Sequence, residues 1–292
     1  MQPTLMTTAE VAAYLRLRER TIYEMVARQQ IPCSRATGKL LFSRPVIDAW
    51  IEASTEMPRG RAAAPPPIYA GSSEPLLEWA LRQSGSGLAV LFGGSRRGLE
   101  LIARGEALLA GTHLLDAETG TYNLPQIGSL LPQGDIVAIH WAERIQGLLM
   151  AAGNPLGIGS LRDVAERRVR LARRGEGSGS HQLLEILLAR DSLRLDDLVS
   201  PERAAETQAD LAAMIAIGEA DCGLGIRAAA AGLDFLPLWS GDCFDLVMRR
   251  RDYFEPPMQA LLAFAGTEVF ARQAAFLGGY DLARLGTVRF NA

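Results

Sequence analysis

Residues 53–67 contain no periodic apolar face, and they end in three consecutive prolines at 65–67. A run of prolines favours the extended polyproline II conformation, which builds no core of its own. The chain has 292 residues, which is longer than one typical domain. We therefore expect a linker over 53–67 between a small domain at 1–52 and a larger one at 68–292.

Charge is divided unevenly across this linker. Residues 1–44 carry seven Lys and Arg against three Glu, a net charge of +4, whereas the whole chain has a net charge of −3. The remainder therefore carries −7, so that a basic head precedes an acidic body. This asymmetry is expected of a nucleic-acid-binding module fused to another domain, although charge alone does not establish it.

The head shows the start and stop signals of short helices. Thr7 and Glu10 have the spacing of a capping box, which begins one helix, and a second helix follows over about 19–29. Residues 34–44 alternate basic and apolar side chains around a glycine, as a small hairpin does. A third helix follows, with Pro45 at its first position. The order predicts a winged helix-turn-helix.

In a helix-turn-helix the second helix enters the major groove, so its exposed side chains read base edges. The residues predicted to do so are Arg18, Arg20, Thr21 and Tyr23. Further basic residues would contact phosphates, which supply most of the sequence-independent affinity for DNA. These residues are Arg28, Arg35, Lys39 and Arg44. Double-stranded DNA is thus an expected partner, although a merely solvated face would carry the same side chains.

An ordered series of motifs runs through the head. The motifs are Thr-Thr-Ala-Glu-Val-Ala at 7–12, Arg-Thr-Ile-Tyr at 20–23, Ile-Pro at 31–32, Phe-Ser at 42–43 and Ile-Asp-Ala-Trp-Ile at 47–51. This series resembles the excisionase/MerR-type winged-helix family. The resemblance implies DNA binding, although domains of this kind also bind proteins or only pack against their own chain.

From residue 68 onward, strand-like runs alternate with helical ones. The expected strands are 88–92, 136–140, 169–172 and 246–248, and the expected helices are 75–83, 98–109, 181–189 and 208–218. This alternation favours an α/β domain with a mostly parallel sheet. Gly/Ser-rich turns at 70–75, 93–98 and 173–181 precede helices, where free backbone N–H groups and the helix dipole create anion sites.

These turns occur together with His-Leu-Leu-Asp at 113–116, Tyr-Asn-Leu-Pro at 122–125 and Ala-Asp-Cys-Gly-Leu-Gly at 220–225. Over 68–292 the set resembles the periplasmic-binding-protein-like domains found inside bacterial regulators, whose nearest relatives resemble molybdate-binding proteins. The resemblance implies a type 2 fold, in which two α/β lobes close over a ligand. Lobe 1 would span about 68–150 and 243–292, and lobe 2 about 151–242.

The same resemblance implies which residues hold the ligand. The first lobe would contribute Ser72, Ser73 and Ser95, with Arg96 beside them, and the second lobe Gly177, Ser178 and Ser180. Thr207 and Cys222 are weaker candidates. Taken one at a time, such residues are usually ordinary helix caps and turn glycines.

The expected ligand is a small anion, with molybdate or tungstate favoured by the resemblance, and no other cofactor is expected. In that family neutral donors hold metal oxyanions, yet arginines flank the turns of this chain. They are Arg96, Arg97, Arg173 and Arg174. Because arginine suits carboxylate or phosphate, a phosphate-bearing pterin cofactor or a small organic acid is an open alternative.

Other chemistry has little support in the sequence. The three cysteines are far apart and the three histidines lack metal-site spacing, so neither a disulfide framework nor a metal site is expected. Residues 223–228 fit a dinucleotide fingerprint, but the strand before them is unconvincing. Ser95 is not part of a nucleophile elbow. We therefore do not expect an enzyme.

No apolar run reaches the length of a membrane-spanning helix, and residues 1–8 lack a secretion signal. We expect a cytoplasmic regulator in which ligand binding changes how a homodimer presents its heads to DNA. The alternative is an enzyme or storage protein of molybdenum metabolism whose head only localises it.

Overall fold

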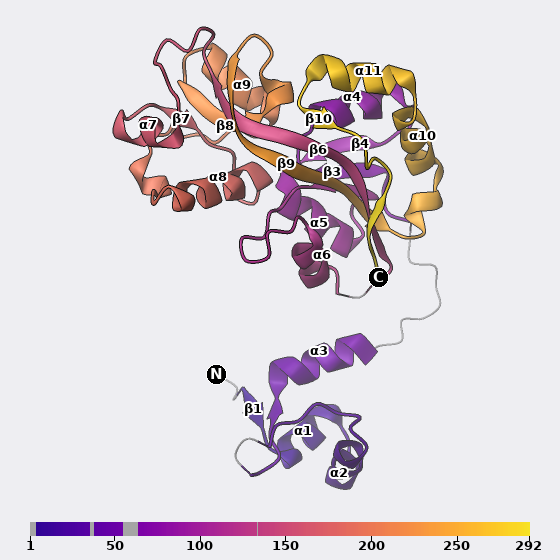
Figure 1. Cartoon of the computed structure of the whole chain (residues 1–292). Helices are drawn as coiled ribbons and strands as arrows, with labels where there is room; N and C mark the ends of the chain where they lie inside the picture. Colours follow the sequence, from indigo (N-terminus) through magenta and orange to yellow (C-terminus); the bar gives the residue numbers. More distant parts are fainter. Residues whose placement is uncertain (1–3, 36–37, 55–63, 133) are drawn as a thin grey trace. The chain divides into compact units, whose positions relative to one another are not determined.

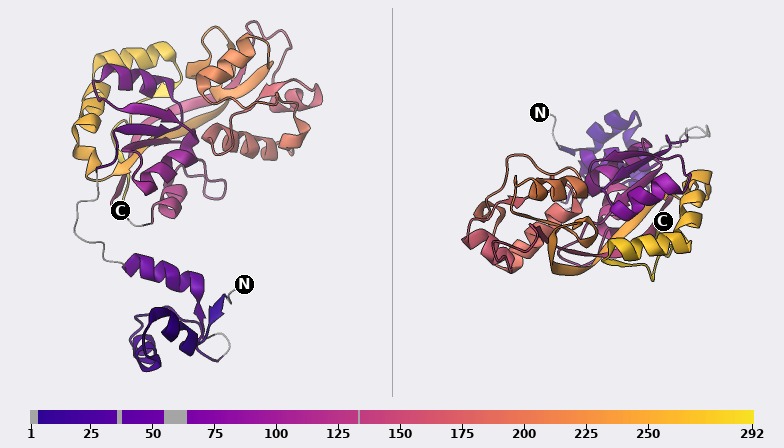
Figure 2. Two further views of the ribbon diagram at one scale, coloured as in Figure 1. Left: turned by 180° about the vertical axis from the view of Figure 1, so that it is seen from behind. Right: turned by 90° about the horizontal axis from the view of Figure 1, so that it is seen from above.

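A computed structural model of the chain describes residues 4–35, 38–54, 64–132 and 134–292. The chain divides into two compact units, Met1–Ala63 and Ala64–Ala292, which we describe separately (Figures 1 and 2). Most of the predicted linker lies outside the described residues.

The first unit is a small helical domain. Its elements are β1 Leu5–Met6, α1 Thr8–Leu15, α2 Glu19–Ala27, β2 Phe42–Ser43 and α3 Arg44–Ser54. The predicted capping box is confirmed, since the Thr7 hydroxyl accepts from the Glu10 N–H and the Glu10 side chain accepts from the Thr7 N–H. It satisfies donors that would otherwise be unpaired at the start of α1.

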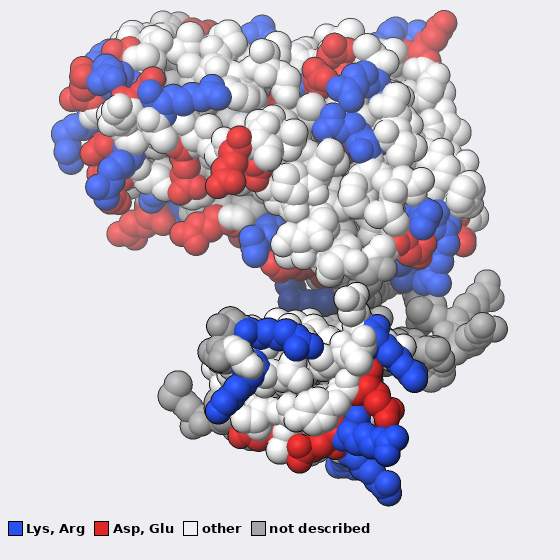
Figure 3. All heavy atoms as spheres, turned by 60° about the horizontal axis from the view of Figure 1, so that its bottom comes forward, with Lys and Arg blue, Asp and Glu red and all other residues white. Residues whose placement is uncertain are grey.

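A small apolar core holds the first unit together. Its buried residues come from every element and from the segment after α2, and they are Met6, Val11, Ala12, Ile22, Val26, Ile31, Phe42 and Ile47. The expected hairpin is present as a bridge between Ser34 and Leu41, while β2 pairs with β1, a two-residue strand that the sequence did not reveal. On this unit, in the lower half of Figure 3, Lys and Arg side chains are exposed beside acidic ones.

The second unit is a larger α/β domain. Its strands are β3 Ile68–Gly71, β4 Ala89–Phe92, β5 Leu109–Thr112, β6 Ile136–Met150, β7 Leu171–Ala172, β8 Cys222–Ile226, β9 Asp234–Arg249, β10 Tyr280–Asp281 and β11 Val288–Asn291. Its α-helices are α4 Pro75–Gln83, α5 Gly94–Arg104, α6 Leu124–Leu130, α7 Leu161–Glu166, α8 Gly179–Arg190, α9 Gln208–Ala216, α10 Pro256–Ala265 and α11 Glu268–Leu277.

Two long antiparallel strands, β6 and β9, run through both lobes of this domain (Figure 1). The strand order is β4-β3-β5-β9-β6-β8-β7, in which β3 pairs in parallel with β4 and β5, and β8 with β7, while β9 pairs antiparallel with β5 and β6, and β6 antiparallel with β8. The expectation of a mostly parallel sheet is therefore wrong. We expected a strand only over 136–140, yet β6 continues to Met150 through polar residues at 143, 144 and 146.

The helices agree closely with the expected ones except at 98–109. There α5 begins earlier, at Gly94, and ends at Arg104, because Gly105 adopts a left-handed conformation with φ 70° and caps it. Leu109 belongs to β5 instead. A glycine at this position ends a helix at little conformational cost.

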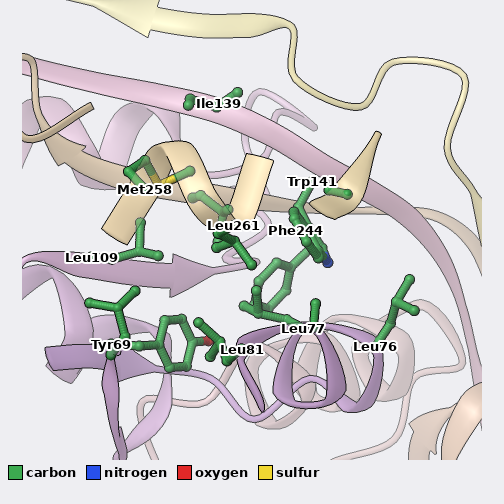
Figure 4. Packing of buried hydrophobic residues seen from close by; sticks show 14 of the residues in the cluster. Tyr69, Leu76, Leu77, Leu81, Leu109, Ile139, Trp141, Phe244, Met258 and Leu261 are labelled. Carbon is green, nitrogen blue, oxygen red and sulfur yellow. The ribbon is translucent and has the colours of Figure 1, made fainter. Parts of the chain in front are cut away.

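The sheet of the first lobe has helices on both faces. On one face, Tyr69, Trp141 and Phe244 pack against side chains of α4, α10 and α11, including Leu77 and Met258 (Figure 4). On the other face, the intervening strand residues pack against α5 and α6. This division follows from the alternation of side chains along a strand.

The second lobe has its own apolar clusters. One joins β8 and the end of β6 to α7 and α8, and another joins β6 and β7 to α9. Among the described residues no single helix is long and apolar enough to cross a membrane, although the bent pair of α10 and α11 passes that test by length and composition.

The lobes contact each other directly at the start of α8. A Cβ atom placed on Gly179 would lie 2.2 Å from the carbonyl oxygen of His113 and 2.6 Å from its Nδ1. Nearby, the Arg96 N–H donates to the Gly177 carbonyl oxygen at 3.3 Å. Because real Cβ atoms do not approach backbone so closely, this contact requires glycine.

We predict that Gly179→Ala holds the lobes apart or strains them by about 1–3 kcal/mol, as overpacking does. Small-angle scattering should then show a larger radius of gyration, and thermal unfolding a lower Tm. Gly128→Ala is the matched control, because its Cβ would meet no atom within 4 Å and Gly128 is exposed on α6. Identical scattering and an identical Tm for both variants would contradict the prediction.

Candidate functional site

The candidate site lies where several strands end and helices begin. The β3–α4 and β4–α5 turns of the first lobe carry Ser72, Ser73 and Ser95, and the β7–α8 segment of the second lobe carries Ser178 and Ser180. Parallel strands present their carboxyl ends at one edge, where α/β proteins commonly bind ligands. All five serines are at least 95% buried, so the structure brings the predicted hydroxyls into the interior.

The first-lobe serines are hydrogen-bonded across the domain. Ser72 Oγ lies 3.0 Å from His113 Nε2, and Ser95 Oγ accepts from the His113 N–H at 3.2 Å. Ser73 Oγ accepts from the N–H of Gln208, which belongs to the other lobe, at 2.9 Å. Ser73 therefore ties α9 to the first lobe.

Two buried carboxamides complete the contact between the lobes, and neither was predicted. Ser180 Oγ donates to Gln146 Oε1 at 3.0 Å, and Gln208 Nε2 donates to Ser180 Oγ at 3.4 Å. Gln146 lies on β6, in the stretch where the expected strand was cut short. Gln208 directly follows Thr207, the predicted residue, and its place at the first position of the expected helix was the signal for it, whereas its burial is known only from the structure.

A buried ion pair lies beside these donors. Arg144 on β6 and Asp242 on β9 are cross-strand partners, and Arg144 Nε and Nη2 donate to Asp242 Oδ2 at 2.9 and 2.5 Å. Burial alone would raise the pKa of Asp242, but Arg144 and His113 hold that pKa well below its usual range. Arg144 also lies over the Phe244 ring, and its buried Nη1 has no partner among the described residues.

Asp242 extends this pair into a chain of hydrogen bonds. Its Oδ1 lies 3.1 Å from His113 Nδ1, so that Ser72, His113 and Asp242 stand in the order of a serine-hydrolase triad. The N–H of Ser72, however, donates to the Gly111 carbonyl oxygen, and all three side chains are about 99% buried or more. We interpret this series of hydrogen bonds as part of a binding site and not as a catalytic triad. The N–H of Ser72 already has a partner, so it is not free to stabilise an oxyanion at Ser72.

Four of the predicted ligand residues have other roles. The Arg96 side chain is 63% exposed and pairs with Glu100, so only its backbone takes part in the lobe contact. Thr207 and Ser178 cap α9 and α8, with hydroxyls that accept from the third residue of each helix. Gly177 contributes its carbonyl oxygen to the lobe contact, and its φ of 81° requires glycine.

Cys222 does not lie in the site. It begins strand β8 and is fully buried within the apolar cluster of the second lobe. Burial raises the pKa of its thiol to about 12. Most of the dinucleotide fingerprint at 223–228 lies in strand β8, where the glycines Gly223 and Gly225 pack closely against Leu211.

A cavity of about 400 Å³ opens at the edge of the site. Residues of both lobes line it, including Phe92, Gly94, Arg174 and Ser178. Arg174 is 4% exposed, and its guanidinium donates to the carbonyl oxygens of Ala205 and Glu206 at 3.0 and 2.8 Å. Burial lowers the pKa of Arg174 to about 10, so it keeps its charge at neutral pH.

No carboxylate forms an ion pair with Arg174 within the part of the chain that the structure describes. The cavity is also lined by Glu176 and Glu206, both exposed. Asp210 and Glu78 act on Arg174 only from beyond ion-pair distance, so a buried guanidinium at the edge of this cavity marks a place where an anionic group would be stabilised. In the same described ranges, no group of three or more His, Cys, Asp or Glu is arranged to hold a metal ion.

The predicted base-reading residues lie at the exposed start of α2. Arg18 is the N-cap of this helix, and Arg20 extends into solvent with a side chain that is 90% exposed and paired with Glu24 at 3.0 Å. Tyr23 is 52% exposed, whereas Thr21 is half-buried. The opposite face of α2 is buried through Ile22 and Val26, as a recognition helix requires.

The predicted phosphate contacts lie in other parts of the first unit. Arg28 follows α2, and Arg35 and Lys39 lie in the hairpin that forms the wing. All three side chains are exposed. Arg44 is half-buried, and its guanidinium lies 4.6 Å from the centroid of the Tyr14 ring, which joins α3 to α1. Tyr14 in turn donates to Asp48 at 2.6 Å.

Two family models match the chain. One, described as a helix-turn-helix domain, matches residues 5–55, and the other, described as a PBP superfamily domain, matches residues 77–266. The uncharacterized protein YvgK of Bacillus subtilis (strain 168) is 25% identical over 307 residues, which cover 97% of this chain and 96% of that protein. Both domains expected from the sequence, and the excisionase type of the first, are confirmed.

Solved structures with a similar fold support the same assignment. The tungstate ABC transporter from Geobacter sulfurreducens aligns with a TM-score of 0.51 at 13% identity, covering 72% of this chain and 97% of that one. The sulfate-binding protein SubI from Mycobacterium tuberculosis H37Rv aligns with a TM-score of 0.50 at 13% identity, covering 73% and 84%. These likenesses concern the fold alone. With a matching model over most of its length, the chain belongs to the PBP superfamily, and a helix-turn-helix domain precedes its binding domain.

Proposed function

We propose that this protein is a transcription regulator that binds double-stranded DNA through its first unit and senses a small oxyanion in its second. The observation that carries the proposal is the meeting of neutral donors from both lobes in one buried contact. Serine hydroxyls from both lobes and the carboxamides of Gln146 and Gln208 converge there.

Neutral donors suit a dehydrated oxyanion because many N–H and O–H groups share its charge without a fixed counter-ion. Helices α5, α8 and α9 begin at this contact, so their positive ends favour an anion. The charge of Arg144 is already balanced by Asp242, and its unpartnered Nη1 is a donor that an anion would satisfy. Molybdate or tungstate is the favoured ligand, and the tungstate and sulfate proteins of similar fold are consistent with that choice.

The effect on DNA follows from linkage. A ligand that binds better when the lobes are closed shifts the domain toward that state, and any difference in DNA affinity between the states becomes ligand-dependent. Helix-turn-helix proteins commonly bind paired half-sites through two-fold symmetry, so we propose that the protein acts as a homodimer. A protein that regulates transcription in this way works in the cytoplasm.

Ligand sensing is tested by thermal unfolding of the full chain with molybdate, tungstate, sulfate, phosphate, formate and a pterin cofactor. A ligand present at 100 times its Kd stabilises the folded state by about 2.7 kcal/mol, so the ligand should raise Tm. Ser180→Ala should reduce the shift, because it removes a hydroxyl at the lobe contact, whereas Ser129→Ala on exposed α6 should not. The absence of a shift with every compound would refute the sensor.

DNA binding is tested with Arg20→Ala and the chain's own promoter in a fluorescence anisotropy titration. If Arg20 contacts a base edge, the variant should lose about 1–3 kcal/mol of binding free energy, and binding of the parent should fall steeply with salt. The matched control is Arg104→Ala, an exposed arginine at the end of α5 in the other unit. Equal affinities of parent and Arg20→Ala would count against this DNA surface.

A second candidate ligand is favoured by one observation, the buried and ion-pair-free Arg174 at the cavity beside the lobe contact. A guanidinium suits carboxylate and phosphate groups, which it binds through charge-assisted hydrogen bonds. The alternative effector is therefore a small organic acid or a phosphate-bearing compound such as a pterin cofactor. A role as an enzyme or storage protein of molybdenum metabolism has no comparable support.

The two ligand classes are separated by Arg174→Gln, measured by calorimetry with molybdate and with phosphonoacetate, which carries a phosphonate and a carboxylate. If an acid group meets Arg174, the variant should bind phosphonoacetate about 10-fold or more weakly, since a hydrogen bond to a charged group contributes about 1.5–3 kcal/mol. Arg97→Gln on α5 is the control for loss of one nearby charge. If the parent binds molybdate but not phosphonoacetate, the result would exclude the organic acid as the effector.

A further inference from the structure

A series of hydrogen bonds runs from Arg144 through Asp242 and His113 to Ser72. The charges of these side chains determine where its protons lie. Asp242 accepts two hydrogen bonds from Arg144, and although burial alone would raise the pKa of Asp242, Arg144 and His113 keep it well below its usual range. Asp242 is therefore a carboxylate, which can only accept hydrogen bonds. The groups that face it must supply the protons.

This condition determines the tautomer of His113. Its Nδ1 lies 3.1 Å from Asp242 Oδ1, so Nδ1 carries a hydrogen. Burial lowers the pKa of His113 in spite of the nearby carboxylate, so the ring is neutral and Nε2 is without a proton. Nε2 lies 3.0 Å from Ser72 Oγ and accepts its only proton. Ser72 Oγ therefore has lone pairs, but no further proton, to offer to another group.

An oxyanion would require the reverse arrangement. Because an oxyanion accepts hydrogen bonds, Ser72 helps to hold it only if the hydroxyl turns away from His113, and Nε2 would then be a buried acceptor without a partner. A proton on Nε2 resolves the conflict: Nε2–H donates to Ser72 Oγ, and the Ser72 hydroxyl donates to the anion. The negative charge of the anion also favours the charged imidazole.

Charged groups face His113 from three elements. Asp242 lies on β9, Arg144 on β6 and Arg174 after β7. The remaining neighbours are neutral, and they are Ser72, Ser95, Gln146, Gly179 and the Phe244 ring, which stacks on the imidazole at 5.8 Å. Because Asp242 and Arg144 balance each other, a proton on His113 supplies positive charge next to a bound dianion.

We propose that the cleft between the lobes takes up one proton together with each oxyanion, and that His113, acting through Ser72, couples the two events and favours dianions over monoanions. This inference rests on oxyanion binding as proposed above. His113 is a positioning residue in this scheme, since Ser72 and not the imidazole touches the anion.

The direction of the pH dependence follows from linkage. Anion binding raises the pKa of His113 above its value in the free protein. The affinity is therefore highest and constant below the free-protein pKa, falls about tenfold per pH unit between the free and bound pKa values, and is constant again above the bound value. Molybdate, tungstate and sulfate stay dianionic between pH 6 and pH 8, so the dependence reports on the protein.

The test is isothermal titration calorimetry on the full chain with molybdate, tungstate and sulfate between pH 6 and pH 8, in buffers with different heats of ionisation. Perrhenate, a tetrahedral monoanion of similar size to tungstate, is the control for charge. We expect uptake of a proton with each dianion, an affinity that falls by up to about tenfold per pH unit, and weaker binding of perrhenate.

His113→Gln supplies a side chain that can donate to Ser72 without titrating, so its affinity should not depend on pH and no proton should be taken up. Ser95→Ala is the matched variant: it loses a hydroxyl beside His113 and should bind more weakly but keep the pH dependence. Circular dichroism checks that both variants fold. If one of them does not fold, the number of protons that the parent takes up with each dianion decides the question. Dianion binding without proton uptake, or uptake that persists in His113→Gln, would overturn the coupling and leave oxyanion binding standing, whereas binding of none of the three dianions would overturn both.

Discussion

The buried pair of Arg144 and Asp242 is the interaction on which the arrangement of the binding domain depends. It joins β6 to β9 at the place where both strands pass from one lobe to the other, and the two residues are 1% exposed or less. Burying two charges costs several kcal/mol per ion unless the geometry is good and further hydrogen bonds are made. Here Asp242 accepts from Arg144 and His113, and Arg144 lies over Phe244, so the pair also orients the imidazole toward Ser72.

The contact between the lobes depends on the oriented imidazole of His113. It depends also on hydroxyl and carboxamide groups that can exchange one hydrogen-bond partner for another. Ser73 with Gln208, and Ser180 with Gln146, make neutral hydrogen bonds across or beside the contact. Such bonds contribute about 0.5–1.5 kcal/mol each, so a bound anion that accepts from the same donors replaces them at small cost. An apolar contact of the same size would not exchange partners in this way. A binding domain made of such bonds is therefore suited to respond to ligand concentration.

The helix-turn-helix unit depends on different interactions. Its fold rests on a small apolar core and on local capping, while Arg20 lies at the surface and pairs with Glu24 four residues later. Exposed pairs of this kind contribute little to stability, so the arginine can exchange its partner for a phosphate or a base. The exposed arginine Arg20 therefore contributes little to the stability of this unit.

The sequence by itself determined the division into two units, because caps, apolar periods and the proline run act over a few residues, and its motifs resemble the two families that the family models match. It also indicated the serines of the cleft, since Gly/Ser turns before helices are local features. Only the tertiary structure decided that β6 and β9 are long antiparallel strands through both lobes, that Cys222 is a core residue, and that Arg96 faces solvent. It alone brought Arg144, Asp242 and His113 together, because residues 98 and 129 positions apart meet only when the strands pair, and a buried ion pair has no signature in local sequence.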